Sequence, residues 1–389
     1  MRPRKLPFVA LVVVLVASTA AVGVARLPAH RLVAAIEVSR DAGLGRLEVH
    51  GKVGAVLQRD EGAVALIDLS TPSKPKVLGR YDDDIPDSFD GDLAFSEDGK
   101  WLFYARQTHQ FSRDGIHVLD VSDPKTPTLM HYQPQGGTLR IAYFNGAGGE
   151  WVFSLDAIHG LVVNRFVPEA GALVPVHVDA LPALKVGGPA SGGLFVERKD
   201  PTLGIPLLYA ATGSTGVQVF DISDPTVPQL LGSWNGTGLA EVEVVATKRS
   251  RTIYGATEYW FDKTIEPRVI VLDATSLEAI KVRDVGGLAC APDDRWRAQG
   301  MALAGTDLYA AYSNAGLSVF REGGSSGASL PLPKAARNEA AAPVTAPYLF
   351  DVEITGRYVY ATDAATGMLV VWSRRGSTTP VPIGACSQV

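Results

Sequence analysis

Short apolar runs, rich in β-branched and aromatic residues, recur along the chain and are separated by turn residues. Near the C-terminus, Phe350–Thr355 and Tyr358–Asp363 are two such runs separated by Gly356, and a third run, Met368–Trp372, follows Gly367. Runs of this length and composition are typical of β-strands. Beyond the apolar N-terminal segment, no window has the sustained 3.6-residue periodicity of an amphipathic helix, so the pattern predicts an all-β protein.

One of these runs repeats with a characteristic ending. It reads as an apolar run, an Asp, a Ser and a Pro, with a second Pro three residues later, at Val64–Pro72, Ile116–Pro124 and Val217–Pro225. Asp and Ser side chains accept hydrogen bonds from nearby backbone N–H groups where a strand ends, and Pro fixes φ in the following turn. Because Pro removes a backbone donor, we expect the strand after this turn to be an edge strand.

The position of this Asp marks the phase of a longer repeat. Equivalent positions, spaced by 45 to 56 residues, are Asp68, Asp120, Arg165, Asp221, Asp273, Arg321 and Trp372. A period of this length is that of a four-stranded propeller blade. The sequence therefore predicts a seven-bladed β-propeller of four-stranded blades in one domain, in which each marked position ends or lies within the third strand.

Three of the segments resemble the LVIVD-repeat family of bacterial and archaeal exported β-propellers. They are Leu66–Ser70, Val118–Pro124 and Val219–Pro225. The strong motif covers three units, whereas the third, sixth and seventh lack the Asp-x-Ser signature and are assigned from spacing. The resemblance implies a propeller fold and a cell-surface or periplasmic setting, and it implies no particular reaction.

The first 25 residues form a predicted export signal. Arg2, Arg4 and Lys5 precede an uncharged apolar run over residues 6–25, which ends in small residues. The run is also long enough to remain as a membrane anchor if it is not cleaved, which is the one membrane contact we expect. The protein is therefore expected to be exported, as a periplasmic, cell-surface or secreted protein.

The remaining chain divides into a lead-in, residues 26–44, and a propeller domain, residues 45–389. Either Leu32–Val38 or Pro380–Gly384 could supply the strand that closes the ring. Residues 321–347 are rich in Gly, Ser, Ala and Pro and are predicted to be a low-complexity loop within the domain.

The net charge bears on the class of binding partner, and the two cysteines bear on a possible disulfide. The formal net charge is −5 and the sequence pI is about 5.8, which disfavours nucleic acid as a partner. Cys290 and Cys386 could pair in an oxidising compartment or remain separate thiols. We expect a monomer.

Two groups of acidic residues are candidate metal ligands. The first is the acidic run in the predicted loop between blades one and two, with Asp82, Asp84, Asp87, Asp90 and Asp92 as the candidates. Ca²⁺ prefers several carboxylate oxygens, but the spacing does not match an EF-hand loop. A solvated acidic loop is the alternative that the pattern favours.

The second group lies where inner strands are predicted to begin. Asp92, Glu241 and Asp351 occupy equivalent phases of blades two, five and seven, so we expect them to approach the mouth of the central channel. There they could bind a cation or raise each other's pKa. A wet channel lined by polar groups that hold water is the favoured alternative.

Two predicted loops carry aromatic residues that we expect to be exposed. Tyr259 and Trp260 fall between the second and third strands of blade five, and Asp293, Trp296 and Arg297 fall in the next loop between blades. Aromatic residues beside Arg suit recognition of a protein or glycan, and packing between blades is the alternative.

Catalytic motifs are lacking. No two histidines have metal-ligand spacing, and no phosphate-binding loop is present. We therefore expect an exported, non-catalytic propeller that binds a protein or glycan through its loop face, with no cofactor or with Ca²⁺ alone. The alternatives are a cation-dependent hydrolase or lactonase-like propeller with Asp92, Glu241 and Asp351 around a central ion, and a structural envelope protein.

Overall fold

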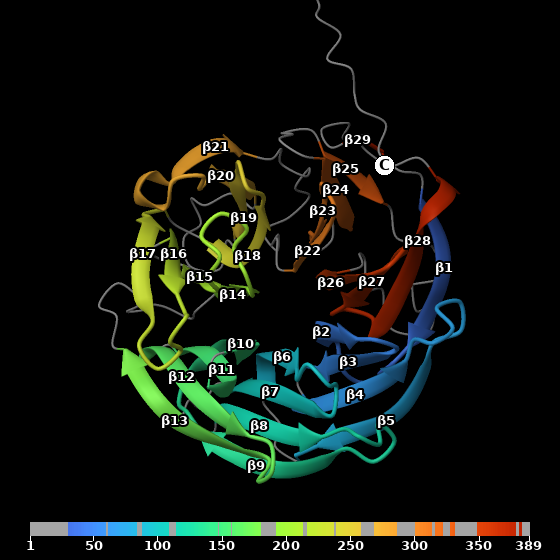
Figure 1. The fold of residues 1–389 in the computed structure, drawn as a ribbon. Coiled ribbons are helices and arrows are strands. Elements are labelled where there is room, and N and C mark those ends of the chain that lie inside the picture. Colours follow the sequence, from blue (N-terminus) through green and yellow to red (C-terminus); the bar gives the residue numbers. More distant parts are fainter. Residues whose placement is uncertain are drawn as a thin grey trace, which may run out of the picture.

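The computed structural model shows an all-β propeller of seven blades arranged around a central axis (Figure 1). The structure describes residues 30–59, 61–83, 88–108, 114–146, 148–156, 158–179, 192–212, 216–236, 239–257, 268–285, 300–312, 316–321, 327–330, 348–378 and 381–382. The predicted export signal or anchor lies outside these ranges. Within them, no helix has the length and apolar character needed to cross a bilayer.

The first four blades are built from consecutive antiparallel strands. Blade one has β2 (Leu44–His50), β3 (Val53–Gln58), β4 (Ala63–Asp68) and β5 (Lys76–Asp82). Blade two has β6 (Ser88–Phe95), β7 (Trp101–Thr108), β8 (Gly115–Asp120) and β9 (Thr128–Pro134). Blade three has β10 (Thr138–Gly146), β11 (Gly149–Asp156), β12 (Gly160–Val167) and β13 (Ala172–Asp179). Blade four has β14 (Gly192–Glu197), β15 (Leu207–Thr212), β16 (Gly216–Asp221) and β17 (Gln229–Trp234).

The last three blades follow the same order, and the first-named strand of each lies nearest the axis (Figure 1). Blade five has β18 (Leu239–Ala246), β19 (Arg251–Thr257), β20 (Val269–Asp273) and β21 (Lys281–Val285), with the 3-10 turn η3 (Leu277–Ala279) before its outer strand. Blade six has β22 (Met301–Ala304), β23 (Asp307–Ala311), β24 (Leu317–Arg321) and β25 (Gly327–Leu330). Blade seven has β26 (Leu349–Thr355), β27 (Tyr358–Asp363) and β28 (Met368–Thr378).

The N-terminal strand β1 (His30–Glu37) completes blade seven and closes the ring. It pairs antiparallel with β28, with Ile36 opposite Leu369 and Leu32 opposite Trp372. The C-terminal strand β29 (Val381–Pro382) pairs instead with β25, which makes blade six five-stranded and departs from the predicted four. Closure by a strand distant in sequence ties the two ends of the domain together.

The hydrophobic core is divided among the seven contacts between neighbouring blades. Seven clusters of buried apolar residues each combine side chains from two adjacent blades. The cluster between blades seven and one, for example, joins Tyr360 and Leu369 with Leu47 and Ile67. Middle strands are covered on both faces, so they read as continuous apolar runs rather than as alternating ones.

The repeated Asp ends the third strand as predicted. Its Oδ1 accepts the backbone N–H two residues later, at 2.8 Å from Ser70, 2.9 Å from Ser122, 2.8 Å from Ser223 and 3.0 Å from Thr275. The same local turn therefore recurs in blades one, two, four and five, and it precedes the outer strand in each.

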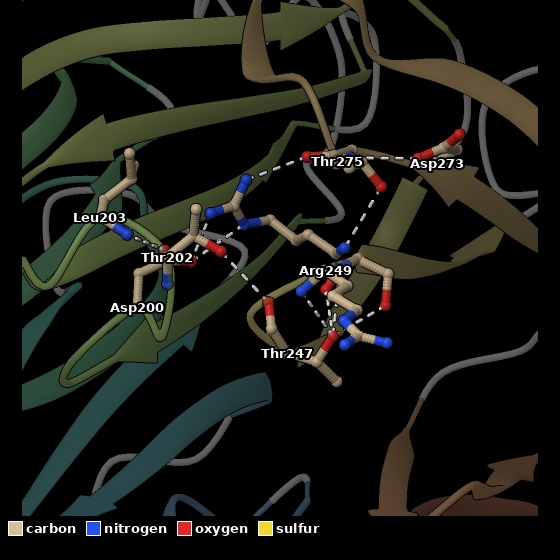
Figure 2. A network of polar contacts seen from close by, with 10 residues as sticks. Asp200, Thr202, Leu203, Thr247, Arg249, Asp273 and Thr275 are labelled. Atoms are coloured by element: carbon tan, nitrogen blue, oxygen red, sulfur yellow. Dashed lines mark hydrogen bonds and ion pairs between the residues drawn. The ribbon is translucent and has the colours of Figure 1, made fainter.

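A polar network around a buried ion pair joins blades four and five at the end of the ring where the inner strands finish (Figure 2). Asp200 accepts hydrogen bonds from the N–H groups of Thr202 and Leu203, at 2.9 and 2.7 Å, and pairs with Arg251, whose Nε lies 3.1 Å from Oδ2. Thr202 also donates to the carbonyl of Thr247 at 3.2 Å. The buried charges of Asp200 and Arg251 therefore compensate each other at the contact between the two blades.

Candidate functional site

The seven inner strands present equivalent residues to the central channel near the ends where the strands begin. We call these positions the first ring: Arg46, Asp92, Arg140, Gly193, Glu241, Gly300 and Asp351. A shift in register includes or directly precedes this position in four blades, between Leu44/Leu47, Thr138/Arg140, Leu239/Glu241 and Leu349/Asp351. Such bulges bend a strand and change the direction of its side chains. The same irregularity therefore recurs where the inner strands begin to line the channel.

Arg46 holds the charged part of the first ring together. Its Nη1 lies 2.6 Å from Glu241 Oε2 and 3.4 Å from Asp351 Oδ1, and the exposed fractions of the three side chains are 6, 13 and 6%. These contacts join blade one to blades five and seven. Carboxylates paired in this way with a guanidinium are held in place by the protein itself.

Two first-ring aspartates also bind the backbone of the next blade. Asp351 Oδ2 accepts the N–H of Leu47 at 2.9 Å, and Asp92 Oδ2 accepts the N–H of Ile141 at 2.9 Å. The same contact thus links blade seven to blade one and blade two to blade three.

The first-ring glycines leave space for these carboxylates. A Cβ atom at Gly193 would lie 2.5 Å from Glu241 Oε1, and one at Gly300 would lie 2.6 Å from the Cα of Asp351. The carboxylate of the following blade therefore occupies the space that a side chain would fill in blades four and six.

Burial and charge act in opposite directions on the first-ring carboxyls. Burial raises the pKa of Asp92 to about 6, although Arg46 and Arg140 oppose the shift. Burial likewise raises the pKa of Glu241 and Asp351, and Arg46 is the largest opposing influence on both. Without Arg46 these groups would bind protons more readily.

A second set of channel positions lies two residues further along each inner strand. We call it the second ring: Glu48, Ala94, Ala142, Phe195, Glu243, Ala302 and Glu353. Residues two apart on a strand face the same side, so both rings line the channel. Burial raises the pKa of Glu48 to about 8 and that of Glu243 and Glu353 well above the usual value, and neighbouring carboxylates raise all three further.

A cavity of about 300 Å³ opens beside this second ring, across blades four to seven. It is lined by Phe195, Glu243, Val244, Ala302, Leu303, Glu353 and Ile354. Two carboxyls therefore share a pocket with one aromatic and four aliphatic side chains.

Sequence reasoning missed the three second-ring glutamates. The signal was available as a spacing of two between charged residues, in Arg46-Leu-Glu48, Glu241-Val-Glu243 and Asp351-Val-Glu353. It indicates two layers of charge along one face of a strand only when the strand is known to line a channel.

The acidic run between blades one and two is partly described. Asp82 pairs with Arg80 at 3.0 Å on the surface, and the neighbouring Asp83 pairs with the buried Arg106. Asp84, Asp87 and the side chain of Asp90 lie outside the described residues. Among the groups that the structure does describe, no three His, Cys, Asp or Glu residues are placed so as to hold a metal ion.

The predicted recognition loops also lie outside the described residues, together with the two cysteines. These residues are Tyr259, Trp260, Asp293, Trp296, Arg297, Cys290 and Cys386. The strands before the two loops end on the first-ring side. Thr257 at the end of β19 pairs with Leu239, and Val285 at the end of β21 pairs with Ile270.

Comparison with known proteins places one blade in a described repeat family. Residues 208–236, which run from β15 into the end of blade four, match the LVIVD repeat. The comparison with curated protein sequences gave no match.

Several solved structures share the fold at low identity. A functionally unknown protein from Desulfotomaculum acetoxidans DSM 771 superposes with a TM-score of 0.52 and 14% identity, over 73% of this chain and 84% of that one. The WD40 β-propeller domain of Doa1 gives 0.55 and 10%, over 89% and 99%. Raptor from Chaetomium thermophilum gives 0.57 and 13%, over 91% of this chain and 30% of that one. At these identities the likeness extends to the propeller fold alone.

Proposed function

We propose that this LVIVD-repeat β-propeller is an exported, non-catalytic binding protein that takes a protein or glycan partner at its loop face. By loop face we mean the end of the ring where the inner strands begin and the first ring lies. The observation that carries the proposal is the pairing of Arg46 with Glu241 and Asp351. In this pairing the charged groups of the first ring bind one another and connect the blades, so we assign partner recognition to the surrounding loops.

The same pairing weighs against a hydrolase with a central ion. A Ca²⁺ ion takes six to eight oxygen ligands, and a catalytic ion needs a further open position. Here Arg46 occupies one oxygen of Glu241 and lies beside Asp351, while backbone N–H groups occupy an oxygen of both Asp92 and Asp351. A metal would have to displace these contacts.

Recognition by the loops is supported by their composition and by where their flanking strands end. Trp260 follows β19 and Trp296 follows β21, and both strands end at the loop face. Aromatic side chains beside Arg and Asp supply apolar contact area together with hydrogen-bonding groups, which suits both sugar rings and protein surfaces.

The test compares matched variants of the full exported chain on an array of oligosaccharides and in cross-linking to envelope proteins in the producing cell. Trp260→Ala with Trp296→Ala should reduce binding at least tenfold. Lys52→Ala, at the exposed β2–β3 turn on the opposite end, should leave binding unchanged. Both variants should keep the melting temperature of the parent.

Three results would overturn the proposal. The first is the absence of any glycan or protein partner in both assays. The second is a loss of thermal stability in the tryptophan variant without ligand, which would show a packing role. The third is a Ca²⁺-dependent hydrolysis of lactones that Asp92→Asn abolishes, because it would establish the catalytic alternative.

A further inference from the structure

The cavity beside the second ring has a lining suited to one kind of ligand. Glu243 on β18 and Glu353 on β26 flank it, and Ala302 on the intervening β22 is small enough to leave the space between them open. Phe195 on β14 forms the aromatic wall, and Val244, Leu303 and Ile354 complete it with aliphatic carbon.

The ionisable groups around this cavity are mostly acidic. Burial raises the pKa of Glu243 and Glu353 most, and the pKa of Glu243 is raised further by Glu241, Asp351 and Glu48, that of Glu353 by Glu48, Asp351 and Glu243. Arg46 and Arg140 act on the first-ring carboxyls, Asp92 and Glu241. The positive charge of the channel is therefore engaged in the first ring, and the cavity lies in the acidic second ring.

We propose that this cavity binds a small organic ammonium ion, with the ammonium group between Glu243 and Glu353 and the carbon chain against Phe195 and the aliphatic wall. A volume of about 300 Å³ falls within the range of small-molecule sites. An ammonium group can donate hydrogen bonds to both carboxylates, and the Phe195 ring offers apolar contact area to the carbon chain. This inference goes beyond the proposed function and does not depend on the loops.

A bare metal ion fits the lining less well than an ammonium ion. Hard cations demand oxygen ligands on most sides, whereas five of the seven lining residues contribute apolar side chains. The lining does suit a ligand with a charged end and an apolar body.

Binding to such a site is coupled to proton release. Because burial and neighbouring carboxylates raise the pKa of Glu243 and Glu353, an ammonium ion that pairs with their carboxylates competes with protons for them. Affinity should therefore rise with pH, by up to about tenfold per pH unit for each proton released.

The experiment is isothermal titration of the full chain with n-pentylamine at pH 6.5, 7.5 and 8.5, in two buffers that differ in ionisation enthalpy. The neutral isostere 1-pentanol and CaCl₂ serve as comparison probes. We expect pentylammonium to bind with proton release and with affinity that rises with pH. Glu243→Gln and Glu353→Gln should each weaken it at least tenfold, and Glu61→Gln on the outside of blade one should not change it.

Other outcomes overturn the proposal. An absence of pentylammonium binding at every pH would refute it, and so would equal binding of 1-pentanol. Tighter binding of Ca²⁺ that depends on Glu243 would replace it with a metal site. Trp260→Ala with Trp296→Ala should bind pentylammonium as the parent does, so failure of this inference and failure of the proposed function are separate results.

Discussion

Replacement of Arg46 by Met tests whether the first ring holds the blades together. The substitution keeps an unbranched side chain that can pack as the stem of Arg46 does, and it removes the guanidinium that contacts Glu241 at 2.6 Å and Asp351 at 3.4 Å. Both carboxylates would remain buried without their cation. Loss of one partner from a buried ion pair costs about 3–5 kcal/mol, because the remaining charge is uncompensated.

The cost should depend on pH in a defined direction. Arg46 opposes the burial that raises the pKa of Asp92, Glu241 and Asp351, so its removal lets the pKa of each rise further in the folded state. The folded protein then binds more protons than the unfolded chain, and stability falls as pH rises from the unfolded pKa, near 4, toward the raised folded pKa. We therefore expect a deficit of about 4 kcal/mol at pH 8 and about 1–2 kcal/mol at pH 5, where protonation removes the unpaired charge.

The assay is urea unfolding of parent and variant at pH 5 and pH 8. Arg80→Met is the matched control, because Arg80 forms exposed pairs with Glu61 and Asp82 and should cost at most about 1 kcal/mol. Adding Glu241→Gln to Arg46→Met should restore part of the loss at pH 8. A deficit no larger than that of the control, or one equal at both pH values, would refute the role assigned to Arg46.

Two further predictions concern blade contacts and closure. Asp200→Asn should destabilise the fold by about 3–5 kcal/mol at pH 7, because it leaves the buried Arg251 without its anion. Burial opposes ionisation of Asp200, but hydrogen bonds from Arg251 and from the N–H groups of Leu203 and Thr202 outweigh it and lower the pKa of Asp200. In urea unfolding, the difference in stability between parent and variant should therefore shrink as pH falls below about 4. A difference that is unchanged at pH 3 would contradict this explanation. Deletion of residues 1–37 should expose the edge of β28, so the variant should aggregate on size-exclusion chromatography and melt at a lower temperature. Deletion of residues 381–389 removes only the two-residue strand β29 and should change aggregation and melting temperature little. Equal behaviour of the two truncations would contradict closure by β1.

Much of the fold follows from local pattern. The spacing of the repeated Asp predicts seven units, and the structure has seven blades whose third strands end at or contain the marked positions. The turn that follows depends on contacts within two residues, as between Asp68 and Ser70, so the sequence around it suffices. The strand phase also places Asp92, Glu241 and Asp351 at equivalent positions of their blades.

The channel chemistry could not be predicted to the same degree. Arg46 meets Glu241 and Asp351 across 195 and 305 residues of chain, and nothing in the neighbourhood of Arg46 indicates those partners. The sequence interpretation therefore grouped the three carboxylates as candidate metal ligands or as the polar lining of a wet channel, and left out the arginine between them. It also left out Glu48, Glu243 and Glu353, whose pKa values are raised first by burial in the channel and then by carboxyls brought together from blades one, two, five and seven.

The sequence by itself determined the strand order, the number of blades and the turn before each outer strand of the strong repeats, because these depend on short apolar runs, on their regular spacing and on contacts between near neighbours. Only the tertiary structure decided that β1 closes the ring and that β29 joins blade six. It also decided that the channel has a first ring with ion-paired residues and, two residues further along the inner strands, a second ring with three glutamates. These features depend on how seven blades pack around one axis, and that packing brings together residues whose separation along the chain carries no periodic signal.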